Sequence, residues 1–243
     1  MNMKKEVRFE FNPPIYHPFY FIRRGLLQGI EKYSMRLNGR MMDFGCGSKP
    51  YKNLFKNVSE YIGIDFENTG HPHENEQIDV FYDGKNIPFS DNHFDSVLAS
   101  EVFEHIFNLD QVLAEINRVL KPEGNILITV PFVWNEHEVP FDYARYTVFA
   151  LKDMLEKKGF DIVEMHKCTD YIKTIAQMRA LYITTAINPI LKKVFRYIPF
   201  VRKGIFFFLI LFSNLWGSIA SAILPKRYDW YCNTVVLAKK KST

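Results

Sequence analysis

The sequence lacks the cysteine clusters that structural zinc sites and disulfide frameworks require. Its three cysteines, Cys46, Cys168 and Cys232, are widely spaced along 243 residues, and none belongs to a CxxC pair. We therefore expect no metal site, and this cysteine usage favours a reducing compartment such as the cytoplasm. The first 14 residues, MNMKKEVRFEFNPP, contain acids and prolines but no apolar core, so a signal peptide is not expected either.

Acidic residues are almost absent from the last third of the chain. From residue 171 onward there are 12 Lys and Arg but a single acid, Asp229, whereas acids outnumber bases before that point. Such asymmetry suggests that the C-terminal third meets an anionic partner. Because 47% of the residues are hydrophobic, the chain can bury one sizeable core, and a single domain is expected.

Short apolar runs alternate with helical patterns over most of the chain. The runs MMDF, EYIGIDF, FDSVLAS, NILITVPF and DIVEMH are rich in Val, Ile and Leu and are predicted to be strands buried on both faces. An amphipathic pattern over 17–37 predicts a helix that covers one side of their sheet. The alternation predicts an α/β fold with an open, mostly parallel sheet and helices on both faces.

Two further helices have recognisable ends. One is predicted to begin at a capping box of Asn108 and Gln111 and to stop at Pro122. The other is predicted to run from a Thr147 cap to Gly159.

The turn after the first strand, DFGCGSKPY, is unusually rich in small residues. In an open parallel sheet, ligands bind beyond the carboxyl ends of the strands, where this turn lies. Gly45 and Gly47 let the backbone approach a ligand closely, and Asp65 ends the second strand, where an acid can bond the ribose hydroxyls of a nucleoside cofactor. Pro50 replaces the third glycine of the dinucleotide fingerprint, which disfavours pyrophosphate binding.

These residues resemble a known family. DFGCG looks like motif I, D/E-x-G-x-G, of the class I S-adenosylmethionine-dependent methyltransferases, and the segment from YDGKNIPFSDNHFDSVLASEVFEHI to LAEINRVLKPEGNILITVPF resembles the same family's central strands. The similarity covers about residues 38–168 and is close to the ubiquinone and menaquinone methyltransferases. It implies a Rossmann-like sheet of seven strands with an antiparallel last strand, and S-adenosyl-L-methionine as cofactor.

The same resemblance implies a set of cofactor-binding residues. Asp43 and the backbone of Gly45 and Gly47 would hold the methionine part, and Asp65 the ribose. The remaining residues of the set flank the adenine, in the case of Asp83 and Gly84, or lie beside the sulfonium, in the case of Ser100 and Glu101.

A hydroxyl acceptor also needs a base near neutral pKa to take its proton. His105, in EVFEHI, resembles the family's EH pair and is one candidate. We predict His137 as the base and Arg145 as an anion clamp, because the loop PFVWNEHEVPFDYARYT is expected to cover the cofactor mouth. The alternative is that Glu136, Asp142 and Arg145 pair only to order this loop.

The chain departs from a minimal methyltransferase near its C-terminus. We expect an N-terminal helical region over 1–37, a cofactor-binding core over 38–168, an insertion over 169–228 and a final strand over 229–240. Within the insertion, residues 204–224 carry no charge and are long enough to span a bilayer.

Three interpretations of this apolar segment stay open. It could span the membrane, or it could pack within the protein or a dimer through the small residues Ser213, Gly217 and Ser221. It could also lie in the membrane interface, which would explain the basic tail and predict a peripheral enzyme at the inner face of the membrane. The acceptor would then be lipid-linked, instead of a free small molecule. The side chains expected to insert are Phe206 to Phe208, Leu211, Leu215, Trp216 and Ile219.

Two other functions are weighed against this one. The chain could be a membrane-tethered cofactor-binding module without turnover, or a nucleic-acid methyltransferase whose basic tail follows phosphates. A nucleic acid has no use for the continuous apolar run among the bases, so that partner is disfavoured. The strand FDSVLAS is followed by EVF and not by an NPPY-like tetrapeptide, which favours an oxygen acceptor over an exocyclic amine. The sequence predicts no oligomeric state.

Overall fold

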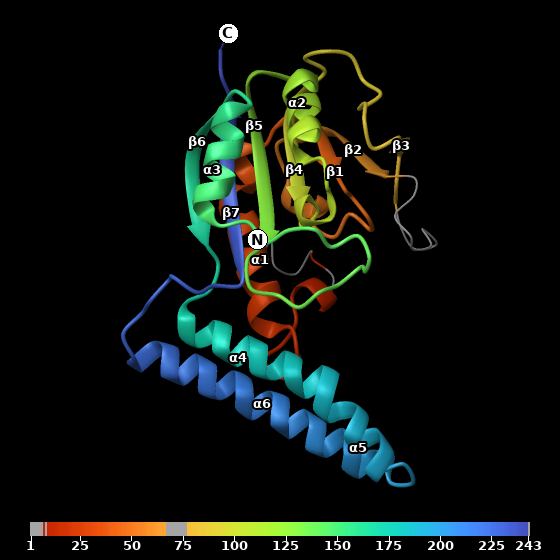
Figure 1. Cartoon of the computed structure of the whole chain (residues 1–243), viewed down its shortest axis with the longest axis vertical. Coiled ribbons are helices and arrows are strands. Elements are labelled where there is room, and N and C mark those ends of the chain that lie inside the picture. Colours follow the sequence, from red (N-terminus) through yellow and green to blue (C-terminus); the bar gives the residue numbers. More distant parts are fainter. Residues whose placement is uncertain (1–6, 8, 67–76, 243) are drawn as a thin grey trace.

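The computed structural model describes residue 7 and residues 9–66 and 77–242. Most of the first eight residues, where no signal peptide was expected, lie outside the described part of the chain. Within this part of the chain, seven strands form one sheet in the order β3-β2-β1-β4-β5-β7-β6 (Figure 1). The strands are β1 (Gly39–Phe44), β2 (Val58–Phe66), β3 (Val80–Tyr82), β4 (Phe94–Ser100), β5 (Leu120–Pro131), β6 (Phe160–Lys167) and β7 (Asn233–Lys240). Only β7 runs antiparallel to its neighbours. The predicted fold class is therefore confirmed.

Helices cover both faces of the sheet, as predicted. One face packs against α1 (Tyr20–Tyr33), and the opposite face against α2 (Leu109–Val119) and α3 (Val148–Lys157). In β5, Leu127 belongs to the core on the α1 side, whereas Ile126 and Ile128 belong to the core on the α2 and α3 side. This alternation is what a strand buried on both faces requires. Short 3₁₀ turns occupy Phe9–Phe11, Ser34–Arg36, Lys52–Leu54 and Phe103–His105.

The predicted helix ends are confirmed for α3 and wrong for α2. Thr147 caps α3, because its hydroxyl accepts a hydrogen bond from the Ala150 amide, and the chain leaves through Gly159 at φ +80°. The capping box of α2 was wrong: the Asn108 and Gln111 side chains bond each other at 3.1 Å and leave the backbone uncapped. The helix also ends before Pro122, since β5 pairing begins at Leu120.

The prediction that the strands are buried on both faces is wrong for β6, the strand at one edge of the sheet. The DIVEMH segment lies in β6, which has a neighbour on one side only, and Val163 is 44% exposed. Strand β3 was not predicted; its three residues give too short a pattern to detect.

A helical hairpin between β6 and β7 projects from the sheet (Figure 1). We call it the arm. It consists of α4 (Tyr171–Tyr182), a π-helical turn (Ile183–Ile187), α5 (Asn188–Val194) and α6 (Pro199–Ile223). Because β6 runs parallel to β5, the arm leaves from the edge where the carboxyl ends of β1, β4 and β5 lie. The arm and the glycine-rich turn therefore share one end of the molecule.

The two faces of α6 differ sharply. The small residues predicted to allow close approach do so: Ser213, Gly217 and Ser221 are buried, and a Cβ on Gly217 would lie 2.4 Å from the Ala176 Cβ in α4. The opposite face is apolar and open to solvent. Its exposed side chains are Phe208 (53%), Phe212 (64%), Trp216 (41%), Ile219 (58%) and Ile223 (76%). Among the described residues, α6 is the single helix long and apolar enough to cross a membrane.

Candidate functional site

The glycine-rich turn adopts a conformation that side chains would obstruct. Gly45 and Gly47 have φ of +69° and +44°, in the left-handed region that favours glycine. A Cβ on Gly45 would lie 2.4 Å from the Val102 Cγ2, so Val102 leaves no room for a side chain at this position. The Gly47 amide donates to Asp65 Oδ2 at 3.0 Å, which ties the turn to the end of β2.

Two adjoining cavities open beyond the carboxyl ends of the strands. The larger, of about 510 Å³, is lined by Asp65, Asp83 and Gly84 together with Phe66 and Tyr82. The smaller, of about 320 Å³, is lined by other predicted residues and by apolar side chains of the N-terminal region. Both volumes are of the size that small-molecule ligands occupy. The cavities share the lining residues Gly45, Gly47, Glu101, His105 and Glu138.

Asp43 is a buried carboxyl group at the floor of the smaller cavity. It is 3% exposed, and the Tyr61 hydroxyl donates to its Oδ2 at 2.5 Å. Burial raises the pKa of Asp43 to about 7, although the Tyr61 hydrogen bond acts in the opposite direction. A cationic ligand group would stabilise the charged form of this carboxylate.

Glu101 is held in a strained position between the two cavities. Its φ is +55°, which is costly for a residue with a side chain. Its two oxygens accept from the Thr129 hydroxyl at 2.9 Å and from the Asn233 amide at 2.6 Å. Burial raises the pKa of Glu101 to about 7, and these hydrogen bonds act against that rise. The neighbouring Ser100 hydroxyl lies 2.9 Å from Thr129 Oγ1.

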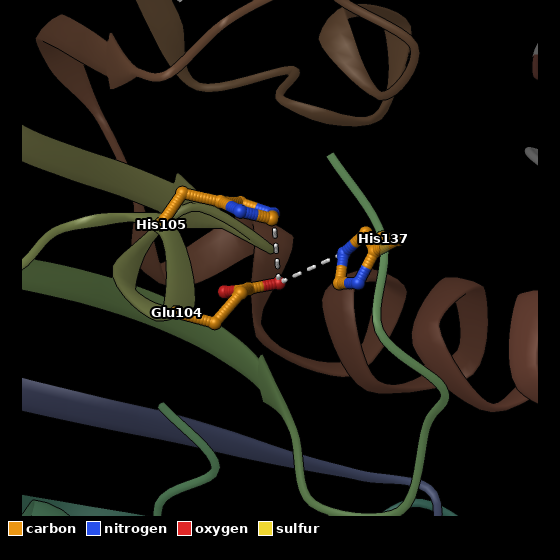
Figure 2. Close-up of side chains that lie close together, drawn as sticks. All are labelled: Glu104, His105 and His137. Carbon is orange, nitrogen blue, oxygen red and sulfur yellow. Dashed lines mark ion pairs between the residues drawn. The ribbon is translucent and has the colours of Figure 1, made fainter. Parts of the chain in front are cut away.

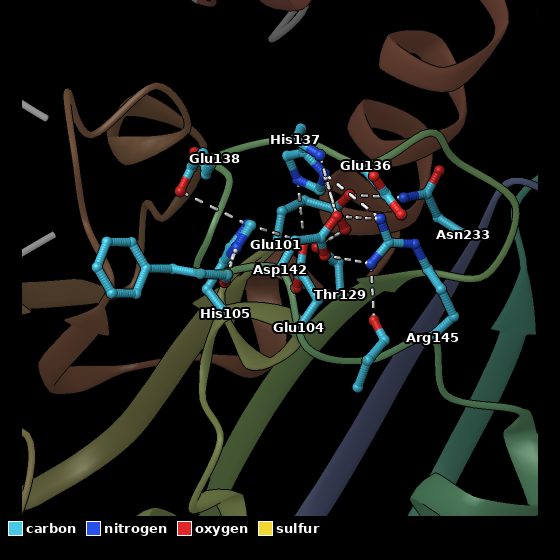
Figure 3. Close-up of polar contacts among 12 residues, drawn as sticks. Glu101, Glu104, His105, Thr129, Glu136, His137, Glu138, Asp142, Arg145 and Asn233 are labelled. Carbon is cyan, nitrogen blue, oxygen red and sulfur yellow. Dashed lines mark hydrogen bonds and ion pairs between the residues drawn. The ribbon is translucent and has the colours of Figure 1, made fainter. Parts of the chain in front are cut away.

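The loop after β5 is ordered by an ion pair (Figure 3). Arg145 binds Asp142 through both ends of its guanidinium, at 2.5 and 2.7 Å, and also donates to the Asn135 carbonyl. Burial acts to raise the pKa of Asp142, but the Arg145 hydrogen bonds lower it to about 2. The pairing that was weighed as an alternative thus exists between Asp142 and Arg145. An anion clamp would need Arg145 to leave this partner, and that role stays a prediction.

His137 lies in the same loop and faces the strand ends. Its amide donates to Asp142 Oδ2 at 3.0 Å, and its ring meets the His105 ring edge to face, with centroids 4.6 Å apart. Burial, and then the nearby His105, lower the pKa of His137 below its usual 6.5. The imidazole is therefore neutral at pH 7 and able to accept a proton.

Glu104 is the residue of this site that the sequence did not single out. Its side chain is fully buried, and neither carboxylate oxygen has a hydrogen-bond partner in the described part of the chain. Oε1 lies 3.7 Å from His105 Nε2 and 3.9 Å from His137 Nε2 (Figure 2). Burial, and then the charge of Glu101, raise the pKa of Glu104 well above its usual value. An acid within the apolar run EVFEHI was the available signal.

The structure brings almost all the predicted site residues together. Every one lines at least one of the two cavities except Arg145, which is paired with Asp142. The division follows the predicted roles, although the roles themselves stay predictions. The smaller cavity gathers Asp43, Ser100 and His137, and the larger gathers Asp65, Asp83 and Gly84, with the shared residues between them.

Sequence comparison finds relatives of the central part of the chain. Residues 42–128 match a family model described as a methyltransferase domain. A ubiquinone/menaquinone biosynthesis C-methyltransferase of Paraburkholderia phymatum is 30% identical over 107 residues, which are 41% of this chain and 44% of that protein. The chain thus matches less than half the length of this curated relative.

Structural comparison extends the similarity to nearly the whole chain. The [4+2]-cyclase SpnF covers 91% of this chain and 82% of its own, with a TM-score of 0.56 and 16% identity. Phosphoethanolamine N-methyltransferase 2 of Haemonchus contortus, solved in complex with S-adenosyl-L-methionine, covers 90% of this chain and 53% of its own, with a TM-score of 0.53 and 19% identity. At these identities the likeness concerns the fold.

Proposed function

Because the chain carries a class I S-adenosylmethionine-dependent methyltransferase domain, we propose that it methylates an oxygen atom of a lipid-linked acceptor at an anionic membrane surface. The family match confirms the resemblance noted from the sequence and supports S-adenosyl-L-methionine as the cofactor. One observation carries the rest of the proposal: an exposed apolar helix face lies at the end of the molecule where the cofactor cavities open.

The residues of the two cavities fit this cofactor. Asp43 is a buried carboxyl group that would meet the ammonium of the methionine part, and the backbone of Gly45 and Gly47 lines the same cavity. Asp65 would accept from the ribose hydroxyls, and Asp83 lies where the adenine would end. When bound, the cofactor supplies a methyl group already activated by its positive sulfur.

The protein then has to orient the acceptor, exclude water and remove a proton. The smaller cavity offers aromatic walls from Phe19 and Trp134, which suit an apolar or ring-bearing acceptor. His137 lines the same cavity as a neutral imidazole and is our candidate for the base. His105 donates its Nδ1–H to the Phe141 carbonyl oxygen, 2.9 Å away, which fixes its ring beside His137.

The arm supplies the membrane part of the proposal. A contiguous exposed apolar face is unusual for a soluble protein and is typical of an interaction surface. The tip of the arm adds exposed basic side chains, including Lys192, Lys193, Arg196 and Lys203. Apolar side chains at headgroup depth with cations around them describe an interfacial helix. The packing of Ser213, Gly217 and Ser221 against the protein leaves the opposite face of α6 for the lipid.

Methyl transfer to isolated membranes tests the proposal. Purified protein is incubated with methyl-labelled S-adenosyl-L-methionine and either membranes or the soluble extract of the same cells. We expect label in base-stable, solvent-extractable lipid. Label confined to nucleic acid or to water-soluble products would contradict the acceptor class, and cofactor binding without any transfer would favour a binding module.

A further inference from the structure

We propose that Glu104, His105 and His137 form a binding site for a divalent transition-metal ion at the junction of the two cavities. Glu104 Oε1 and one ring nitrogen of each histidine all lie within 4.8 Å of one another (Figure 2). One carboxylate and two imidazoles form a donor set of catalytic zinc and iron sites, which keep a further position open for a substrate.

The distances fit a metal site whose ligands move closer together on binding. Ligand atoms about 2.1 Å from a tetrahedral ion lie about 3.4 Å apart. Glu104 Oε1 is 3.7 Å from His105 Nε2 and 3.9 Å from His137 Nε2. These separations are too long for hydrogen bonds, yet a shift of a few tenths of an ångström would bring the Glu104 oxygen and either histidine nitrogen to the spacing of two ligands of one ion. The histidine nitrogens themselves lie within 4.8 Å of each other and have to approach further on binding.

Both histidines are oriented as metal ligands usually are. A ligating imidazole generally donates its other ring N–H to a carbonyl or carboxylate, which aims the free nitrogen at the ion. Nδ1 of His105 lies 2.9 Å from the Phe141 carbonyl oxygen. Nδ1 of His137 lies 3.3 Å from both Asp142 Oδ2 and the Asn135 carbonyl oxygen. In each ring this leaves Nε2 facing Glu104, and Arg145 in turn fixes Asp142 (Figure 3).

The buried Glu104 carboxylate provides the second, independent observation. Both of its oxygens lack a hydrogen-bond partner among the described residues, although the side chain is fully buried. Protonation would not resolve this, because the new O–H would be a buried donor without an acceptor. Buried charges are normally paired or coordinate a metal. The cation is therefore the partner that Glu104 lacks.

A fourth coordination position is available next to the cavities. Glu138 Oε2 lies 3.6 Å from His105 Nε2, and its side chain is 47% exposed and lines both cavities. If the proposed function holds, an acceptor oxygen can take this position, and the ion lowers the pKa of its hydroxyl so that the proton passes to solvent. His137 would then act as a ligand and not as the base. From the sequence we expected no metal site because we considered cysteine ligands, whereas the ligands proposed here are a carboxylate and two imidazoles.

Cobalt titration of the full-length, chelator-treated protein tests the site, with visible absorption bands reporting the coordination. We expect saturable binding of one Co²⁺ per chain, displaced by Zn²⁺. Glu104→Gln and His137→Gln should each weaken binding by at least about 100-fold, since loss of even an outer partner costs 10–100-fold. His166→Gln, on the exposed edge strand β6, is the matched control and should bind as wild type does.

Thermal unfolding separates a ligand role from a structural one. Glu104→Gln keeps the size of the side chain, so the metal-free variant should melt close to wild type while losing the stabilisation that Co²⁺ gives. The proposal is overturned if wild type shows no saturable Co²⁺ binding, which is the result expected if water molecules bridge the three side chains. It is also overturned if the two variants bind Co²⁺ like the control.

The same preparations keep this proposal distinct from the methyltransferase proposal. Full methyl transfer in excess chelator, together with no Co²⁺ binding, would remove the metal site and leave the proposed function. Cobalt binding that depends on Glu104 and His137, without methyl transfer to any acceptor, would keep the site and remove the proposed function.

Discussion

The end of the sheet where the cavities open, here called the cavity edge, differs from the arm in which side chains it buries and which it exposes. At the cavity edge, the Asp43 carboxylate is buried and the Glu101 carboxylate half-buried, and most of their oxygens are held by neighbouring donors. On the arm, Phe212 and Ile223 are more than half exposed although they are apolar. Each arrangement is costly in isolation, because buried charge and exposed hydrocarbon both raise the free energy of the folded chain. On our proposal, both costs are met by partners: a small cationic ligand at the cavities and a lipid surface at the arm.

The largest expected effect concerns the apolar face of the arm. Replacing Phe208, Phe212 and Trp216 together by Ser should weaken binding to anionic vesicles by at least about 1000-fold, since each buried aromatic side chain contributes about 1.5–3 kcal/mol. Vesicle flotation measures this, and cofactor affinity should not change. Phe149→Ser is the matched control, because Phe149 is 80% exposed on α3, away from the arm. An equal loss in the control would erase the difference between the two regions.

The next effect belongs to the cavity edge. His137→Ala should lower methyl-transfer turnover by about 100-fold or more, whether His137 is the general base or a ligand of the proposed ion, while vesicle binding stays at the wild-type level. Steady-state rates at saturating cofactor give the measurement. If cofactor affinity and melting temperature fall together instead, the histidine supports the loop and not the reaction.

The basic tip of the arm should contribute less than its apolar face. Changing Lys192, Lys193 and Arg196 to Gln should weaken vesicle binding by up to about 150-fold at low salt, from at most about 1 kcal/mol per charge. The difference from wild type should shrink as salt rises, because charges are screened over about 10 Å at 0.1 M. Loss of Lys152 and Lys157 on α3 is the control. Binding that ignores both salt and alkaline carbonate would indicate a true membrane span.

The smallest effect tests the ribose assignment. Asp65→Ala should reduce cofactor affinity by about 5- to 150-fold, the equivalent of 1–3 kcal/mol for a removed hydrogen-bond partner. Calorimetry provides the value, and Glu60→Ala on the same strand, where Glu60 pairs with Arg40 at the surface, is the control. Wild-type affinity in the Asp65 variant would remove the ribose assignment and leave the arm unaffected.

Much of the cavity edge could be predicted from the sequence because local signals determine it. Gly45 and Gly47 stand where the backbone needs positive φ, and Asp65 lies near the end of a strand that the apolar pattern already marks. Thr147 and Gly159 mark the ends of α3 in the same local way.

Features that depend on distant contacts could not be predicted. Glu104 and His137 are 33 positions apart, and only the path of the loop after β5 brings them within 3.9 Å. The exposure of β6 depends on its place at the edge of the sheet, which its own residues do not encode. On the arm, the apolar run and the small-residue stripe were both visible, but which face packs against α4 is decided by tertiary contact.

We propose that the cavities and the arm serve one reaction on one lipid-linked acceptor. Mass spectrometry of lipid, polysaccharide and nucleic-acid fractions is the most direct test. It compares cells that have the gene, cells that lack it, and cells in which the gene is replaced by the arm variant, with Phe208, Phe212 and Trp216 changed to Ser. We predict one lipid-linked compound that lacks a single methyl group in the cells without the gene, and only partial recovery with the arm variant. A missing methyl group found only in nucleic acid or in a water-soluble compound, or full recovery with the arm variant, would contradict the account.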